Sequence, residues 1–533
     1  MAQACPGPSQ FFEPQRPGCG SAMPSSDDGW ASDGDGGWAS DGDVEGADGR
    51  DDESADDVPA PGEGGPNTAP CPSEADSGAA WWSKFVRDYF AGDLRDRGQQ
   101  QRPLRLWSAC TGCWSEGFCA QALGIHIAAE SVGMADMKTA SYEFLRATQY
   151  SDKVMGCYWN TMGDMASSRP CRRHPNAHSC SLPPPLHVDM FVCCTPCQPF
   201  TRVRSTSRCT DHNLFGSTFA EDDSVLAVAR AILPKCLILE QVEGFHSQFQ
   251  DLARTPLQNF LGEMLNVKRR CGTTHFSGHC VLRLNSKPWI TCSRPRLYVV
   301  LAVEELGGQR ACDAISSRVQ GLVADRQNAP PTCVMSILEV DAERRRPQAA
   351  PAGPDAAPDD PKWKKRSMDV RSGIGMPLDA APWTSTHRLA GVSRAPRHLD
   401  VIDVAWWTHM KCTGGRSDGQ CAPGLFVDYS QNVDRKPWTS DIATFLQNST
   451  IYSFKLDAKL TEQDKAKIMG FPDAVAGSLV NAVSASAASS LIGEGVHFAC
   501  VGAVIMAAFV SEEAEWWIGP RCLQPALKRA RAA

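Results

Sequence analysis

Basic residues are almost absent from the first 80 residues of this 533-residue chain. That segment holds 17 Asp and Glu but only Arg16 and Arg50, a net charge of −15. Because the whole chain carries −8, the remaining residues carry +7, and a basic folded body favours a polyanionic partner. A Gly-rich acidic tract cannot bury enough apolar surface to fold, so we expect residues 1–80 to be a disordered acidic tail. Such a tail is either solubilising or an arm that binds a partner.

Long apolar segments are also missing. No N-terminal stretch combines a basic start with an apolar core, so we expect no secretory signal. The longest apolar run, residues 498–510, is shorter than the roughly 20 residues that span a bilayer and is typical of a buried helix. We therefore expect no membrane partner. Without a secretory signal the 23 Cys are expected to be reduced rather than paired in disulfides.

From residue 104 the pattern changes to short apolar runs, each followed by a longer helical stretch. The expected strands are residues 104–109, 125–129, 188–194, 236–239 and 297–303, and the expected helices are residues 116–123 and 224–233. Strands that alternate with helices predict an α/β fold with a doubly wound, mostly parallel sheet. Ligands of such sheets bind beyond the carboxyl ends of the strands, which makes the polar residues there the candidates for function.

Three features with reactive or charged side chains lie at the ends of these expected strands. Cys197, in the run Cys-Thr-Pro-Cys-Gln-Pro, directly follows an expected strand, and Glu240 ends the next one. Arg294 and Arg296 precede a further strand at alternate positions, which predicts that both face the same side. Taken alone, Cys-Thr-Pro-Cys is best explained as a chance product of a Cys-rich chain, and a redox pair or half of a zinc site are the alternatives. A strand-end Glu is often a cap, and an Arg pair is often a solvated edge.

Together and in this order, the three features resemble the cytosine-C5 DNA methyltransferase family, whose motifs read Pro-Cys-Gln, Glu-Asn-Val and Gln-x-Arg-x-Arg. Further segments resemble the family's methyl-donor loop, its Gly-Asp-Ile segment and its Gly-Phe-Pro and Gly-Asn-x-Val elements. These segments are residues 106–117, 160–165, 469–473 and 493–496. The similarity covers about residues 104–303 and 451–510.

The resemblance implies the fold of S-adenosylmethionine-dependent methyltransferases, with a smaller target-recognition region inserted into it. The implied parts are a catalytic core at 103–303, a variable recognition region at 304–450 with a linker at 345–366, a return to the core at 451–512 and a basic tail at 513–533. Basic clusters of the variable region would contact phosphates, and its Trp residues would stack on bases. The alternative is that these Trp residues are buried in a hydrophobic core.

The resemblance also implies roles for single residues. Cys197 would be the nucleophile that adds to C6 of cytosine, Glu240 would protonate N3, and Arg294 and Arg296 would orient the base. The cofactor would be S-adenosylmethionine, and the residues implied to bind it are Ser108, Gly112, Glu130, Asp164, Pro196 and Glu494. The implied partner is DNA, and a nuclear location follows from that substrate.

Several positions depart from the family's pattern. Of the three glycines of the donor loop only Gly112 remains, Gln241 replaces the Asn after the catalytic Glu, and Glu494 replaces an Asn near the C-terminus. We therefore predict a divergent enzyme. The alternatives are a tRNA methyltransferase, a catalytically silent nucleic-acid-binding relative, and a thiol oxidoreductase that uses Cys194 and Cys197.

A separate Cys- and His-containing segment lies between two expected strands. Cys171, His174, His178 and Cys180 are four potential zinc ligands within ten residues. Their spacing is not that of a standard zinc finger, so we expect a loop insertion without metal and assign no metal site.

Overall fold

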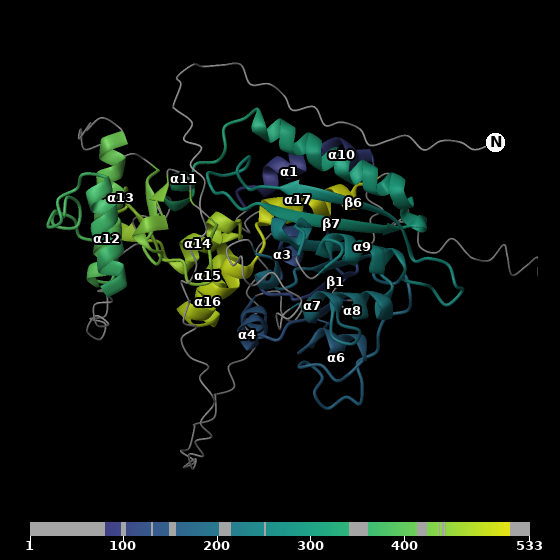
Figure 1. Cartoon of the computed structure of the whole chain (residues 1–533). Helices are drawn as coiled ribbons and strands as arrows, with labels where there is room; N and C mark the ends of the chain where they lie inside the picture. The colour runs from purple at the N-terminus through teal and green to yellow at the C-terminus, as the bar shows by residue number, and fades with distance from the viewer. Residues whose placement is uncertain are drawn as a thin grey trace, which may run out of the picture. The chain divides into compact units, whose positions relative to one another are not determined.

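The computed structural model describes parts of the compact unit Cys71–Ala533 (Figure 1). The described residues are 80–96, 103–128, 132–148, 156–201, 215–249, 252–339, 361–412, 424–435, 438–439, 442 and 444–511. The expected acidic tail, except for Ala80, and the expected basic tail lie outside them.

A seven-stranded sheet forms the centre of this unit, in the order β3-β2-β1-β4-β5-β7-β6. Its strands are β1 (Leu106–Ala109), β2 (Gly133–Ala135), β3 (Cys157–Trp159), β4 (Met190–Cys193), β5 (Cys236–Gln241), β6 (Phe276–Leu284) and β7 (Arg296–Val303). Strands β1 to β5 pair in parallel, and β7 lies antiparallel between β5 and β6. The strand order reverses between β1 and β4, which is the point where open α/β sheets bind ligands.

Helices cover both faces of the sheet, so the predicted doubly wound α/β fold is confirmed. On one face α3 (Ser115–Ala122), α10 (Gly308–Gln327) and α17 (Phe498–Phe509) pack together, and α1 (Ser83–Tyr89) packs on α17. On the other face α6 (Met162–Ala166) packs against α8 (Val225–Ile232) (Figure 1). All 12 residues of α17 are buried. A C-terminal helix therefore completes the core that β1 begins.

The remaining helices are mostly short. They are α2 (Ala91–Asp96), α4 (Thr139–Ala147), α7 (Gly216–Phe219), α9 (Pro256–Leu265), α11 (Val334–Glu339), α12 (Pro361–Gly373), α13 (Pro396–Cys412), α14 (Glu462–Met469), α15 (Asp473–Ala482) and α16 (Ala485–Glu494). Single 3-10 turns are η2 (Gln198–Phe200), η4 (Glu243–His246), η5 (Glu304–Leu306) and η7 (Val433–Arg435). Among the described residues no single helix is long and apolar enough to cross a membrane, and only α16 and α17 together, bent by 48°, reach that length and composition.

A second, smaller sheet has its own core. Its order is β11 (Ala458–Lys459), β10 (Ile451–Ser453), β8 (Phe426–Asp428) and β9 (Trp438–Thr439). A separate hydrophobic cluster joins it to α13, with Trp383 at its centre and Trp406, Trp407 and Trp438 packed against it. Trp383 is therefore a core residue, which was the alternative to base stacking, whereas Trp406, Trp407 and Trp438 pack against that core and stay partly exposed.

The structure differs from the expected elements at the second strand. Residues 125–128 form only an isolated bridge, between Leu104 and Ile127, and the strand that pairs with β1 begins at Gly133. The chain turns after α3 at Gly124, where φ is 77°, and the apolar residues that follow pack into the core without pairing as a strand. The carboxyl end of β2 is therefore followed by Asp136, and Glu130 lies outside the described residues.

The expected boundaries of the variable region cut across packed elements. Helix α10 lies inside the expected region 304–450, yet it packs on β6 and β7 of the main sheet. Strands β10 and β11 lie in the expected core return, yet they belong to the small sheet. Helix α12 begins within the expected linker 345–366, the rest of which, up to residue 360, lies outside the described residues.

Candidate active site

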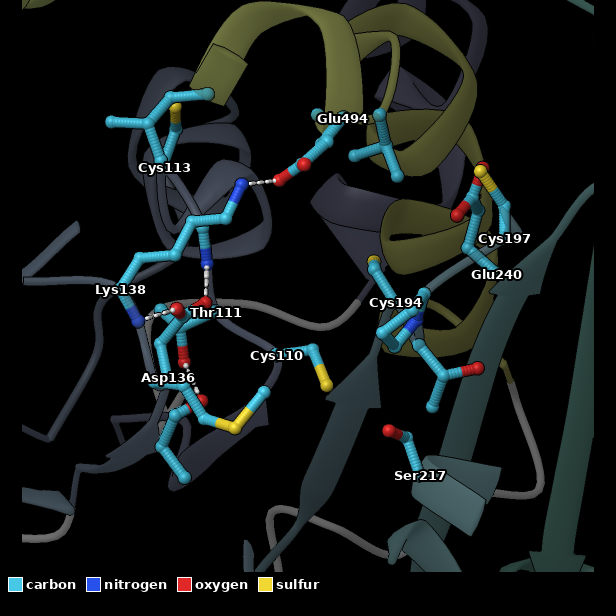
Figure 2. A pocket seen from close by; sticks show the side chains of 18 of the residues that line it. Cys110, Thr111, Cys113, Asp136, Lys138, Cys194, Cys197, Ser217, Glu240 and Glu494 are labelled. Carbon is cyan, nitrogen blue, oxygen red and sulfur yellow. Dashed lines mark hydrogen bonds and ion pairs between the residues drawn. The ribbon is translucent and has the colours of Figure 1, made fainter. Parts of the chain in front are cut away.

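A cavity of about 280 Å³ lies at the carboxyl ends of the parallel strands. Residues that follow β1, β2, β3 and β4 line it, together with Glu240 at the end of β5, Arg296 at the start of β7 and the last residues of α16. Figure 2 shows Cys197 and Glu240 on one side of this cavity and Asp136 and Lys138 on the other. The cavity therefore joins the expected nucleophile to the expected donor loop.

Cys197 lies in a tight turn directly after β4. The Phe200 N–H donates to the Cys197 carbonyl at 2.9 Å, and the Phe200 ring packs edge-on against Phe245. Behind the turn, the Gln241 side-chain amide donates to the Thr195 carbonyl at 2.8 Å and to its hydroxyl at 2.7 Å. Gln241 thus braces the turn from β5, although it replaces the Asn of the family's pattern.

Glu240 and Arg296 form a buried ion pair beside this turn. Because β5 and β7 are antiparallel, Glu240 lies opposite Tyr298, and Arg296 is its diagonal neighbour on the same face. Arg296 Nε lies 2.8 Å from Glu240 Oε1. Among the described residues, that oxygen accepts no well-aligned hydrogen bond. The carboxyl group can therefore accept a further hydrogen bond although its ion pair with Arg296 is short.

Burial dominates the electrostatics of the two reactive groups. It raises the pKa of the Cys197 thiol, and the Arg296 guanidinium opposes this rise. Burial also raises the pKa of Glu240, again against Arg296 and Arg294. The side chain of Arg296 therefore favours a thiolate on Cys197, while Glu240 retains its proton to higher pH than a free carboxyl group.

The loop after β1 keeps an unusual backbone without its expected glycines. Cys110, Gly112 and Trp114 all have left-handed conformations, with φ of 51°, 51° and 52°. The Gly112 N–H donates to Asp136 Oδ2 at 2.7 Å, and the Lys138 N–H donates to Asp136 Oδ1 at 2.8 Å. Asp136 therefore fixes this loop from the end of β2.

Two further carboxyl groups of the cavity differ in their partners. Glu116, in the first turn of α3, is 2% exposed, and its Oε1 has no hydrogen-bond partner among the described residues. Burial raises its pKa to about 7. Glu494, by contrast, pairs with Lys138 through one oxygen (Figure 2) and accepts from Gln447 through the other. Glu494 thus ties the end of α16 to the segment after β2.

The predicted site residues divide into three groups. Those that line the cavity are Cys197, Glu240, Arg296, Gly112, Pro196 and Glu494. Ser108, Asp164 and Arg294 do not line it. Ser108 lies within β1 and hydrogen-bonds Glu116, and Asp164 pairs with Arg169 at 3.2 Å. Glu130 lies outside the described residues.

Arg294 and Arg296 differ in their partners, although both lie close enough to Cys197 and Glu240 to favour the charged forms of these groups. Arg294 donates to the carbonyl oxygens of Phe445, Gly493 and Gly495 rather than into the cavity. Strand β7 begins only at Arg296, so the alternation of a regular strand does not extend back to Arg294.

Several charged and polar residues of the cavity wall were not predicted as site residues. They include Glu116, Asp136, Lys138 and Asn160. Asp136 and Asn160 directly follow β2 and β3, which are three residues each. A polar residue after a short apolar run was the available signal, and it was missed because the second strand was placed too early.

Comparisons with known proteins give a structural likeness only. No family model matches the chain, and no curated protein matches it significantly. Similar solved structures include the S. pombe Dnmt2 methyltransferase, with 13% identity, a TM-score of 0.35 and coverage of 77% of this chain and 99% of that one. A DNMT2 mutant from Spodoptera frugiperda has 13% identity, a TM-score of 0.35 and coverage of 76% and 99%. The Entamoeba histolytica methyltransferase EhMeth has 9% identity, a TM-score of 0.36 and coverage of 77% and 98%.

Proposed function

We propose that this chain transfers a methyl group from S-adenosylmethionine to C5 of cytosine in DNA, through a covalent bond between Cys197 and C6 of the base. One observation carries the proposal. Cys197, Glu240 and Arg296, which come from three different strand ends, line one cavity together with the loop after β1. This reaction requires a thiol, a carboxyl group that can give a proton to N3, and a guanidinium.

The donor end of the cavity suits a cationic methyl donor. S-adenosylmethionine carries a sulfonium and an ammonium group against one carboxylate. The lining holds the carboxyl groups of Glu116, Asp136, Asp223, Glu240 and Glu494 against the cations Lys138 and Arg296, so carboxylates outnumber cations even with Glu116 and Glu240 protonated. The unpartnered oxygen of Glu116 is a ready acceptor for the donor's ammonium group.

Further residues would hold the rest of the donor. Each Asp136 oxygen accepts one backbone N–H and keeps a lone pair that ribose hydroxyls can use. Asn160, at the end of β3, would meet the adenine, and Pro196 would close the cavity on the side of Cys197. When bound, the donor would supply an electrophilic methyl group.

The side chains of the chain itself account for the activation of cytosine. The Cys197 thiolate adds to C6, and the electron pair of the C5–C6 double bond moves towards N3 through the ring. Glu240 gives its proton to N3, so the ring becomes a neutral enamine whose C5 can attack the methyl group. After transfer, water takes the C5 proton, N3 returns its proton to Glu240, and the Cys197–C6 bond breaks. These steps restore the thiolate and the Glu240 carboxyl group and release neutral 5-methylcytosine.

The charge of the chain supports a nucleic acid substrate. Outside the first 80 residues the chain carries +7, which suits a phosphate backbone. A cytosine within a duplex would have to leave the stack to reach Cys197, at a cost of a few kcal/mol. The same chemistry fits a cytosine in tRNA, which is the second candidate substrate.

The test is a trapping experiment with 5-fluorocytosine. Fluorine at C5 cannot leave as a proton, so the enzyme remains bonded to the base. We expect DNA containing 5-fluorocytosine and labelled S-adenosylmethionine to give a denaturation-resistant adduct. Cys197→Ser should abolish the adduct, whereas Cys194→Ser, a neighbouring thiol of the same cavity, should retain it.

The outcomes separate the alternatives. An adduct with tRNA and none with DNA would change the substrate and keep the chemistry. Binding of S-adenosylmethionine, measured by calorimetry, without an adduct on either nucleic acid would contradict the proposal and favour a silent relative. Loss of thiol-disulfide exchange in either Cys194→Ser or Cys197→Ser, with no adduct at all, would indicate an oxidoreductase.

A further inference from the structure

A group of metal-binding side chains lies outside the proposed active site. It consists of Cys157, Cys171, His174 and Cys180, whose ligand atoms all lie within 4.8 Å of one another. His174 Nδ1 lies 3.3 Å from the Cys171 sulfur, 3.6 Å from that of Cys157 and 3.8 Å from that of Cys180. Within the described part of the chain, no other such group of His, Cys, Asp or Glu is found.

These separations fit one tetrahedral zinc ion. Zinc lies about 2.3 Å from sulfur and about 2.0 Å from nitrogen, which places tetrahedral nitrogen and sulfur ligands about 3.6 Å apart. The three observed distances scatter around that value. We propose that Cys157, Cys171, His174 and Cys180 bind a single Zn²⁺ ion in a closed Cys₃His site. With four protein ligands, the site is structural rather than catalytic.

The arrangement argues against other uses of the same thiols. An iron–sulfur cluster with two irons would divide the ligands into two pairs around separate metal atoms, whereas His174 lies at similar distances from all three sulfurs. The three cysteines are free thiols. A disulfide would use two of them and leave the third sulfur and the imidazole without a role.

The backbone holds the ligands before any metal arrives. The His174 N–H donates to the Cys171 carbonyl at 3.0 Å, so these two ligands belong to one tight turn. The Cys180 N–H donates to the Ser168 carbonyl at 3.1 Å. Cys157 comes from a different element, the edge strand β3. The metal would therefore fasten the segment between α6 and β4, which has no helix or strand of its own, to the sheet.

The site is also connected to the wall of the active-site cavity. Arg172, between two ligands in sequence, donates to the side chain of Asn160 and to the Met137 carbonyl, and both of these residues line the cavity. Its guanidinium lies 5.5 Å from the Tyr142 ring centroid and 5.8 Å from that of Tyr158. The proposed ion would thus position Arg172 without contacting the reacting groups.

The first test measures the zinc content of the full-length protein. The protein carries no His tag and is purified in reducing buffer without chelators. We expect elemental mass spectrometry to find about one zinc ion per chain. His174→Ala should lose most of it, and His178→Ala should keep it. Both histidines are exposed on the same segment, and only His174 belongs to the group. Zinc absent before and after reconstitution, or retained equally by both variants, would overturn the proposal.

The second test needs no loss-of-ligand variant. Replacement of the metal by Co²⁺ should give the intense visible bands of a tetrahedral site and thiolate-to-cobalt charge transfer. His174→Cys should keep the metal and raise the charge-transfer absorbance, because a fourth thiolate is added. Weak bands typical of six ligands, iron in the purified protein, or a disulfide between Cys171 and Cys180 in place of metal would contradict the site. None of these readouts depends on methyl transfer.

Discussion

Glu116 is a carboxyl group that the fold buries with few partners. It hydrogen-bonds Ser108, its second oxygen is unpartnered, and burial raises its pKa from 4.5 to about 7. The folded protein therefore holds this proton at pH values where the unfolded chain has released it. Stability from Glu116 is fully present below pH 4.5 and is lost as the pH rises towards 7, because deprotonation then favours the unfolded chain.

We predict that Glu116→Gln reduces the loss of stability between pH 5 and pH 8. The rise in the pKa of Glu116 corresponds to a loss of up to about 3 kcal/mol in the free energy of unfolding. A Gln side chain cannot ionise and therefore avoids this loss. Urea unfolding of the two proteins at both pH values measures the difference. Glu143→Gln, a change on the exposed side of α4, should keep the wild-type pH dependence. Equal slopes for wild type and Glu116→Gln would contradict the prediction.

At the residue scale the sequence identified the reacting groups better than the binding groups. Cys197, Glu240 and Arg296 were predicted, and they do lie in one cavity; their roles remain predictions. Asp136 was missed in favour of Glu130, because the residue that meets the cavity is decided by where a strand ends. Three-residue strands such as β2 and β3 are too short for their periodicity to reveal that point.

At the scale of elements, the loop between β1 and α3 holds left-handed conformations at residues other than glycine. Cys110 and Trp114 adopt left-handed conformations, which cost a non-glycine residue roughly 1–2 kcal/mol each. The Trp114 ring lies against Gly117, where an added Cβ would stand 2.0 Å from the ring. The absence of a side chain at Gly117 thus makes room for the Trp114 ring.

We predict that Cys110→Gly stabilises the protein by about 1 kcal/mol, because glycine adopts the left-handed conformation without strain. Cys113→Gly is the matched control. Cys113 is buried, and its φ is not positive, so glycine there should lower the free energy of unfolding. Urea unfolding measures both changes. If Cys110→Gly destabilised the protein as much as Cys113→Gly, the loop would not carry the strain that its φ angles imply.

Fully buried strands were easier to predict from the sequence than partly exposed ones. Strands β4, β5 and β7 are buried along almost their whole length and appear in the sequence as continuous apolar runs. The edge strand β6 was missed, because exposed and partly buried residues interrupt its apolar pattern. Helix α10 was assigned to the variable region because only its packing on β6 and β7 shows that it belongs to the core.

At the scale of the whole molecule, Arg294 joins three segments that lie far apart in the sequence. Its guanidinium donates to the carbonyl oxygens of Phe445, Gly493 and Gly495. It is 1% exposed, and burial lowers its pKa to about 10, so it stays charged at neutral pH. No local pattern could predict these contacts, since the acceptors are backbone oxygens that any residue supplies.

We predict that Arg294→Gln mainly lowers stability, whereas Arg296→Gln mainly slows the reaction. Arg294→Gln removes donors from three carbonyl groups and should lower the free energy of unfolding by about 2–4 kcal/mol. Arg296→Gln should change stability by less than about 1 kcal/mol, because Glu240 can take up a proton when its partner is lost. It should slow formation of the 5-fluorocytosine adduct by about tenfold or more, since the cation that lowers the pKa of Cys197 is gone.

The two measurements are urea unfolding and the rate of adduct formation at a temperature where both variants are folded. If Arg294→Gln slowed the adduct as much as Arg296→Gln while leaving stability unchanged, Arg294 would act on the base and its backbone contacts would be incidental. If both rates fell only in proportion to the fraction unfolded, neither guanidinium would act on the reaction. The expected division instead follows from the geometry, since Arg296 lies at the cavity beside Glu240 while Arg294 donates to the backbone carbonyl oxygens of Phe445, Gly493 and Gly495.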